Sequence, residues 1–99
     1  MTITKNAQGE TLTIAIEGRL DTTTAPELES ELKSSLDGVK ALAFDLQNMQ
    51  YISSAGLRVL LSAQKTMNKQ GSMVIKNASD DVKEIFEVTG FSDILTIEG

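Results

Sequence analysis

Two consecutive serines are the residues of this chain whose type and position best suit chemistry. Ser53 and Ser54 follow the apolar run 39–46 and precede an amphipathic segment, so they stand where a strand gives way to a helix. The first turn of a helix has unpaired backbone N–H groups and the positive end of the peptide dipole, so a serine there either caps the helix or holds a phosphate. For Ser54 taken alone, a helix cap is the simpler interpretation. The choice between cap and modification site decides the function.

The composition excludes most other chemistries. The chain has no cysteine, which rules out disulfides and thiolate metal sites, and no histidine, the usual general base and commonest metal ligand. An enzyme that used Ser54 as a nucleophile would have only a lysine as its base, and the sequence lacks a Gly-x-Ser-x-Gly turn. It also lacks a glycine-rich phosphate loop. We therefore expect a protein that is not an enzyme, without catalytic residues, metal, nucleotide or other cofactor.

Charge and length indicate the kind of protein and partner. Nine Lys and Arg stand against fourteen Asp and Glu, for a net charge of -5, and the basic residues are scattered. Such a chain is repelled by a phosphate backbone, so we expect no nucleic-acid partner. The start lacks the pattern of a signal peptide, and no apolar run approaches the roughly 20 residues of a membrane span. The sequence predicts a cytoplasmic monomer with no direct membrane contact, folded as a single domain over residues 1–99.

Hydrophobic periodicity predicts an α/β fold. Residues 2–5 and 11–17 read as a hairpin, and Gly18–Asp21 as a loop. Thr24 to Glu27 has the pattern of a capping box, with Pro26 tolerated in the first turn. The apolar run 39–46 is typical of a central parallel strand covered by helices on both faces. The result is a mixed, mostly parallel sheet of four to five strands with helices packed on it; its further elements are helix 25–36, a helix with apolar positions 57–67, strand 73–75, a helix capped by Ser79, and a short strand within 94–97.

The predicted topology brings two loops to one edge of the sheet. A right-handed crossover through helix 25–36 makes strands 11–17 and 39–46 parallel, so the loop with Asp21 faces the loop 47–54. This edge nominates a site built from Asp21, Asp45, Ser53, Ser54 and the backbone near Gly56. Each supporting residue also has a structural interpretation. Asp21 can bond its own turn, Asp45 can satisfy loop amides, and Gly56 can serve close packing at the helix start.

Four separated segments carry a resemblance to a known family. They are Gly18–Asp21, the strand end 44–46, the segment Tyr51–Leu57, and residues 82–91 near the end of the chain. In this order, over nearly the whole chain, they resemble the STAS family. More narrowly, the chain is similar to the stand-alone bacterial anti-sigma factor antagonists. The resemblance implies the STAS fold.

The resemblance also implies a phosphorylation switch. In that family the serine two positions before the glycine of the loop-to-helix motif is phosphorylated by an anti-sigma factor that is also a serine kinase, and a serine phosphatase resets it. The matching residue here is Ser54; Ser53, where many members have an acidic residue, is a second or competing acceptor. The unphosphorylated form would bind the anti-sigma factor and free the sigma factor. The expected partner-binding residues are Asp21, Thr22, Thr23, Ser53, Ser54, Gly56, Leu57 and Arg58, supported by Asp45.

Physical chemistry is compatible with such a switch. A phosphate on Ser54 adds about -1.5 to -2 charges, which a helix start accommodates but an interface that buries a neutral hydroxyl beside Leu57 does not. Arg58 can pair with that phosphate, pair with an acidic group on a partner, or be a solvated surface residue. The competing hypothesis is a STAS subunit of a transport or signalling assembly that is never phosphorylated.

Overall fold

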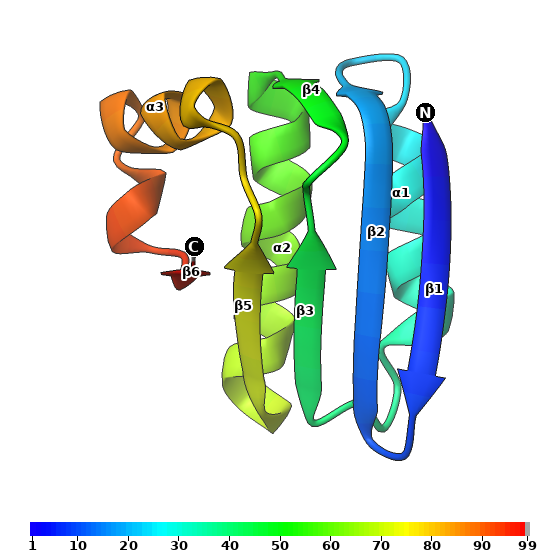
Figure 1. The fold of residues 1–99 in the computed structure, drawn as a ribbon. Coiled ribbons are helices and arrows are strands. Elements are labelled where there is room, and N and C mark those ends of the chain that lie inside the picture. The colour runs from blue at the N-terminus through cyan, green and yellow to red at the C-terminus, as the bar shows by residue number, and fades with distance from the viewer. Residues whose placement is uncertain (99) are drawn as a thin grey trace.

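The protein is described by a computed structural model that covers residues 1–98. It is a layered α/β structure in which one sheet lies in front of two helices (Figure 1). In chain order the elements are β1 (Thr2–Gln8), β2 (Thr11–Leu20), α1 (Ala25–Ser35), β3 (Ala41–Asp45), β4 (Met49–Ile52), α2 (Ser54–Gln70), β5 (Ser72–Lys76), α3 (Asp80–Val88), the short 3-10 helix η1 (Phe91–Asp93) and β6 (Ile97–Glu98).

The sheet is mostly parallel, as predicted. Its strand order is β1-β2-β3-β5-β6, with β4 paired to β2 outside this path. Within residues 1–98 the β1–β2 pair alone is antiparallel, and the pairs β2–β3, β2–β4, β3–β5 and β5–β6 are parallel. The α/β class and the mostly parallel sheet are therefore confirmed. The sheet has six strands instead of four to five, because β4 forms within the segment expected to be a loop.

The core lies between the sheet and the helices α1 and α2. Alternate residues of the three central strands point toward the helices and are buried: Leu12, Ile14, Ile16, Leu42, Phe44, Met73 and Ile75. The expectation that helices cover β3 on both faces is wrong. Within residues 1–98, α1 and α2 lie behind the sheet and no helix crosses its front (Figure 1). The front face carries small or half-buried side chains, among them Thr13, Ala43 and Val74, which share one register row.

The strand β2 is longer than the sequence pattern indicates. Its first half pairs with β3, and its last residues, Gly18–Leu20, pair with β4 instead of forming a loop. The register shifts between Gly18 and Arg19, and Gly18 has a φ of 94°, a left-handed conformation that favours glycine. β4 was missed because its burial does not alternate: Met49 and Ile52 are buried while the two residues between them are exposed. This second pairing carries the chain up to the start of α2.

The remaining helices agree with the sequence pattern. α2 buries Leu57, Leu60, Gln64 and Met67 of the predicted stripe, while Leu61 is half-buried. Ser79 caps α3, with its hydroxyl accepting a hydrogen bond from the Val82 N–H at 3.2 Å. Strand β6 comprises only Ile97 and Glu98 among the described residues, so it begins later than expected; the chain before it forms the 3-10 helix over residues 91–93, and Ile94 is 48% exposed. Among the described residues no helix is long and apolar enough to span a membrane.

Candidate functional site

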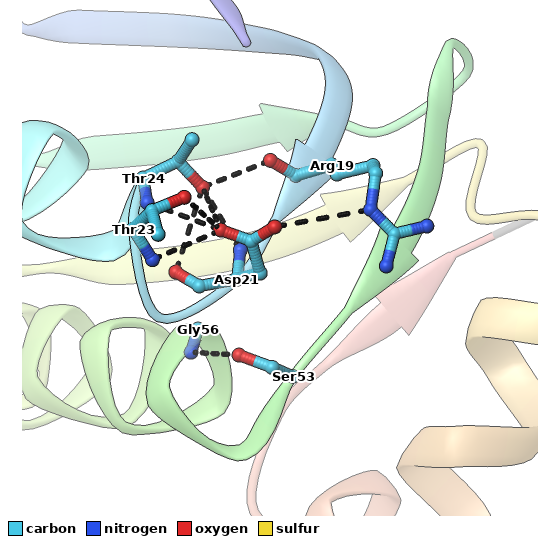
Figure 2. Close-up of polar contacts among 6 residues, drawn as sticks. All are labelled: Arg19, Asp21, Thr23, Thr24, Ser53 and Gly56. Carbon is cyan, nitrogen blue, oxygen red and sulfur yellow. Dashed lines mark hydrogen bonds and ion pairs between the residues drawn. The ribbon is translucent and has the colours of Figure 1, made fainter.

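The start of α2 separates the two candidate serines by role. Ser53 is the N-cap: its backbone is extended, and its hydroxyl accepts a hydrogen bond from the Gly56 N–H at 3.3 Å (Figure 2). Ser54 is the first helical residue and is exposed. Within residues 1–98 no hydrogen bond engages the Ser54 hydroxyl. The interpretation of Ser54 as the helix cap is therefore wrong, because Ser53 already takes that role and leaves Ser54 facing solvent.

Gly56 and Leu57 pack the start of α2 against the core. A Cβ atom on Gly56 would lie 2.7 Å from Leu20 Cγ and 2.9 Å from Ile52 Cγ1, so only glycine lets α2 approach the ends of β2 and β4 this closely. Leu57 is 3% exposed and belongs to the core. In this structure both residues hold the helix start in place, and a contact between Leu57 and a partner stays a prediction.

The loop before α1 is organised by Asp21. Its Oδ1 accepts hydrogen bonds from the Thr23 hydroxyl at 2.7 Å, the Thr23 N–H at 3.0 Å and the Thr24 N–H at 3.2 Å (Figure 2). The predicted capping box is not formed, because the Thr24 hydroxyl does not cap α1. That hydroxyl instead donates to the Arg19 carbonyl at 2.9 Å and accepts from the Asp21 N–H at 2.9 Å. Asp21 is thus the carboxylate that closes this turn.

These hydrogen bonds fix the charge of Asp21. The bond from the Thr23 hydroxyl, helped by the backbone N–H groups of Thr23 and Thr24, lowers the pKa of the Asp21 carboxyl below its ordinary value. Partial desolvation of the carboxyl raises the pKa, but the hydrogen bonds outweigh it. The Arg19 Nε lies 3.8 Å from Asp21 Oδ2, a loose ion pair. The carboxylate therefore stays ionised near neutral pH, and the start of α1 already holds a negative charge.

The two loops meet as the topology predicts. The Ser53 N–H donates to the Leu20 carbonyl at 2.8 Å, which joins the last residue of β2 to the cap of α2. Beside this junction a hollow of about 280 Å³ lies between α1 and α2; its lining includes Thr22, Glu29, Ala55 and Arg58. Thr22 and Thr23 are exposed. The exposed part of the site therefore consists of Thr22, Thr23, Ser54 and Arg58.

Asp45 lies outside this cluster. It is paired with Ala15, five residues before the end of β2, and β4 continues the sheet beyond it. Its Oδ1 accepts hydrogen bonds from the Gln47 N–H at 3.1 Å and from Asn77 Nδ2 at 3.2 Å. The expected convergence of Asp45 with Asp21 and Ser54 is therefore wrong. Asp45 thus binds the backbone amide of the turn after β3 and the Asn77 side chain after β5, which is the structural role that the sequence also allowed.

Arg19 and Tyr51 form a contact at the site that sequence reasoning missed. The two residues are paired across β2 and β4, and the Arg19 guanidinium carbon lies 4.4 Å from the centre of the Tyr51 ring. Such a contact between a cation and an aromatic face restrains a side chain that would otherwise move freely. The sequence could indicate this contact only through the pairing of β2 with β4, and that strand was not predicted.

This arrangement suits modification of a hydroxyl and binding of a protein surface. Ser54 is accessible, begins a helix of 17 residues, and has no acidic residue beside it in the first turn of α2. Among the described residues no group of three or more Cys, His, Asp or Glu side chains is placed to hold a metal ion. Arg19 is held against Tyr51, whereas Arg58, four residues after Ser54 on α2, is exposed.

Comparison with known proteins identifies the family. The STAS domain model matches residues 2–99. The chain is 36% identical over 88 residues to the putative anti-sigma factor antagonist BtrV of Bordetella bronchiseptica, covering 87% of this chain and 76% of the relative. It is 29% identical over 99 residues to the anti-sigma-B factor antagonist of Staphylococcus aureus, covering 98% and 92%.

Solved structures share the fold. The anti-sigma factor antagonist SpoIIAA in its unphosphorylated form superposes with a TM-score of 0.78 at 14% identity, covering 99% of this chain and 88% of that one. Bacillus SpoIIAA in the phosphorylated form gives a TM-score of 0.77 at 15% identity, covering 99% and 92%. At these identities the superposition shows the fold alone, whereas the domain match covers nearly every residue. The chain belongs to the STAS domain family.

Proposed function

We propose that this protein is an anti-sigma factor antagonist switched by phosphorylation of Ser54. In this proposal the unphosphorylated protein binds an anti-sigma factor that is also a serine kinase, and the sigma factor is released. The kinase then phosphorylates Ser54 and ends the interaction, and a serine phosphatase restores the binding form. The names of the curated relatives support the antagonist role, which is that of a regulatory binding protein.

The single observation that carries this proposal is the division of roles between the two serines. Ser53 caps α2, so a change at Ser54 does not remove a structural hydrogen bond. Ser54 is exposed, as are Thr22 and Thr23 of the loop before α1, so a second protein can reach it. A residue that is accessible and structurally dispensable is what a reversible switch requires.

The covalent step is a phosphoryl transfer from ATP. The Ser54 oxygen attacks the γ-phosphorus, a new P–O bond forms, the bond to the β-phosphate oxygen breaks, and ADP leaves while the hydroxyl proton passes to a base of the kinase. The phosphatase reverses the modification by hydrolysis and releases inorganic phosphate. SpoIIAA is named in both forms, and both superpose on this chain with nearly equal TM-scores, which supports a fold that tolerates the phosphate.

Charge accounts for the loss of binding in this proposal. A phosphate adds about -1.5 to -2 charges and three acceptor oxygens at a point meant to contact the partner. A complex that desolvates a neutral hydroxyl must then desolvate or leave unpaired a dianion, at a cost of several kcal/mol. A loss of about 2.7 kcal/mol already weakens binding a hundredfold.

The proposal is tested by titration with the anti-sigma factor that co-purifies with this protein from its native cell. We expect wild type to bind tightly without ATP and to lose binding once ATP is added. Ser54→Ala should bind equally with and without ATP, and Ser54→Asp should bind about a hundredfold more weakly, because it carries a permanent charge. Ser30→Asp, an exposed serine on α1 changed in the same way, is the matched control and should bind like wild type.

Two results would contradict the proposal. If Ser54→Asp bound as tightly as Ser30→Asp, charge at Ser54 would not control the complex. If Ser54 never gained the mass of a phosphate in vitro or in cells, the alternative of an unmodified STAS subunit in a transport or signalling assembly would replace it.

A further inference from the structure

Arg58 is placed to reach the side chain of Ser54. The two residues lie four positions apart on α2, where side chains at i and i+4 are neighbours on one face of a helix. A long side chain on a helix leans toward the N-terminal end, which here is the end that begins with Ser54. An anionic group at i with a cation at i+4 is the favourable order of such a pair.

Arg58 is also free to make this contact. Within residues 1–98 it forms no ion pair and no hydrogen bond through its side chain, and it is exposed. Among the described residues that line the hollow beside it, the one other charged residue is Glu29 of α1, and no ion pair joins the two. Thr22 and Ser62 line the same hollow with neutral hydroxyls. The guanidinium therefore has room to move and no carboxylate to leave.

The other arginine of the chain differs in both respects. Arg19 lies over the Tyr51 ring at 4.4 Å and has its Nε 3.8 Å from Asp21 Oδ2. Moving it toward Ser54 would break both contacts. Of the two arginines in the sequence, only Arg58 can receive a new anion at the start of α2 without losing an existing partner.

We propose that Arg58 binds the phosphate of modified Ser54 as its intramolecular counterion. This inference rests on the proposed phosphorylation of Ser54. The guanidinium donates charge-assisted hydrogen bonds to the phosphate oxygens, which it matches in geometry. Its positive charge then leaves the hollow shared with Glu29 and moves to the start of α2. Phosphorylation thereby changes two surface features together: the neutral hydroxyl becomes anionic, and the cation beside Thr22 is withdrawn.

The test measures the phosphate directly by ³¹P NMR. Phosphoserine is introduced at position 54 during translation, so no kinase is needed, and the second pKa of the phosphate is obtained by titration at low salt. A nearby cation favours the dianion, so Arg58→Gln should raise this pKa by about 0.3. Lys65→Gln, an exposed cation of the same helix eleven residues from Ser54, removes the same charge and should leave the pKa within error. Arg58→Lys should give an intermediate value, because lysine supplies the charge without the planar fork.

The outcomes separate this inference from the proposed function. A rise for Arg58→Gln that is absent for Lys65→Gln and shrinks in 0.5 M salt supports the pairing. Equal values for these two variants, or a rise produced by Arg19→Gln instead, would overturn it. Failure of every candidate kinase to modify Ser54 would contradict the proposed switch and leave the NMR result intact.

Discussion

The helix starts of α1 and α2 lie next to each other and are closed in opposite ways. At α1 a carboxylate closes the turn: Asp21 Oδ1 accepts hydrogen bonds from the Thr23 hydroxyl and from the Thr23 and Thr24 N–H groups, at 2.7 to 3.2 Å. At α2 a neutral hydroxyl does it, with one bond of 3.3 Å from Gly56 to Ser53. Since a helix start favours one nearby negative charge, the first is already satisfied and the second is not.

This difference indicates which helix start tolerates a new negative charge. The first turns of α1 and α3 contain acidic residues, Glu27 in one and Asp80 and Asp81 in the other, whereas that of α2 contains none. A phosphate at α1 or α3 would meet like charge. At α2 the phosphate would lie at a helix start that has no acidic residue in its first turn and has Arg58 nearby, so the protein can accept it and remain folded.

The largest expected effect comes from closing the space under α2. Gly56→Val places side-chain atoms where Leu20 and Ile52 already lie, with the first added carbon 2.7 Å from Leu20 Cγ. We expect the free energy of unfolding to fall by about 3 kcal/mol, measured by urea denaturation. Ala55→Val enlarges the neighbouring residue beside the hollow and should cost about 0.5 kcal/mol. Equal losses would show that the close approach of α2 is not what positions Ser54.

The next effect concerns the charged closure of α1. Asp21→Asn keeps the shape but removes the ionic acceptor, and we expect the melting temperature at pH 7 to fall by about 5 °C. Because the pKa of Asp21 is lower in the folded than in the unfolded protein, its stabilisation is complete above about pH 4 and is lost as the pH falls through the folded pKa. The difference from wild type should therefore shrink as the pH falls below about 4.

Asp37→Asn is the matched control for that charge. Asp37 follows the C-terminal end of α1, where a negative charge opposes the helix dipole. Its removal should leave the melting temperature unchanged or raise it slightly at pH 7. A difference between Asp21→Asn and wild type that did not shrink as the pH fell below about 4 would mean that Asp21 acts through shape and not through charge.

The smallest effects separate the two serines. Ser53→Ala removes the cap of α2 and should lower the free energy of unfolding by about 1 kcal/mol, as Ser79→Ala should at the start of α3. Ser54→Ala removes no hydrogen bond and should stay within about 0.5 kcal/mol of wild type. Urea denaturation of the three variants measures the free energy of unfolding of each. If Ser54→Ala were the more destabilised of the adjacent pair, the assignment of the cap would be reversed.

Sequence patterns predicted the parts of the fold that follow hydrophobic periodicity. The parallel pairing of β2 and β3, the stripe of α2 and the Ser79 cap depend on local spacing, and all are confirmed. The meeting of the Asp21 and Ser53 loops followed from that topology.

What the sequence could not predict depends on contacts between distant residues. β4 lacks alternation, so its pairing with β2, and with it the contact of Arg19 and Tyr51, was hidden. The missed strand also explains the wrong placement of Asp45. Asp45 ends β3, whereas β4 lies between the end of β3 and Ser54, so the two residues are separated by the length of β4. Leu57 was expected both in the apolar stripe of α2 and at the partner contact, and the structure buries it in the stripe.

The central claim is that α2 accepts the phosphate at Ser54 while Ser53 holds the helix start. Site mapping by tandem mass spectrometry, after incubation with ATP and the co-purifying anti-sigma factor kinase, tests it most directly. We expect one phosphate on Ser54 in wild type and in Ser53→Ala, and none in Ser54→Ala. A phosphate found on Ser53 in wild type, or one that persists in Ser54→Ala, would contradict it.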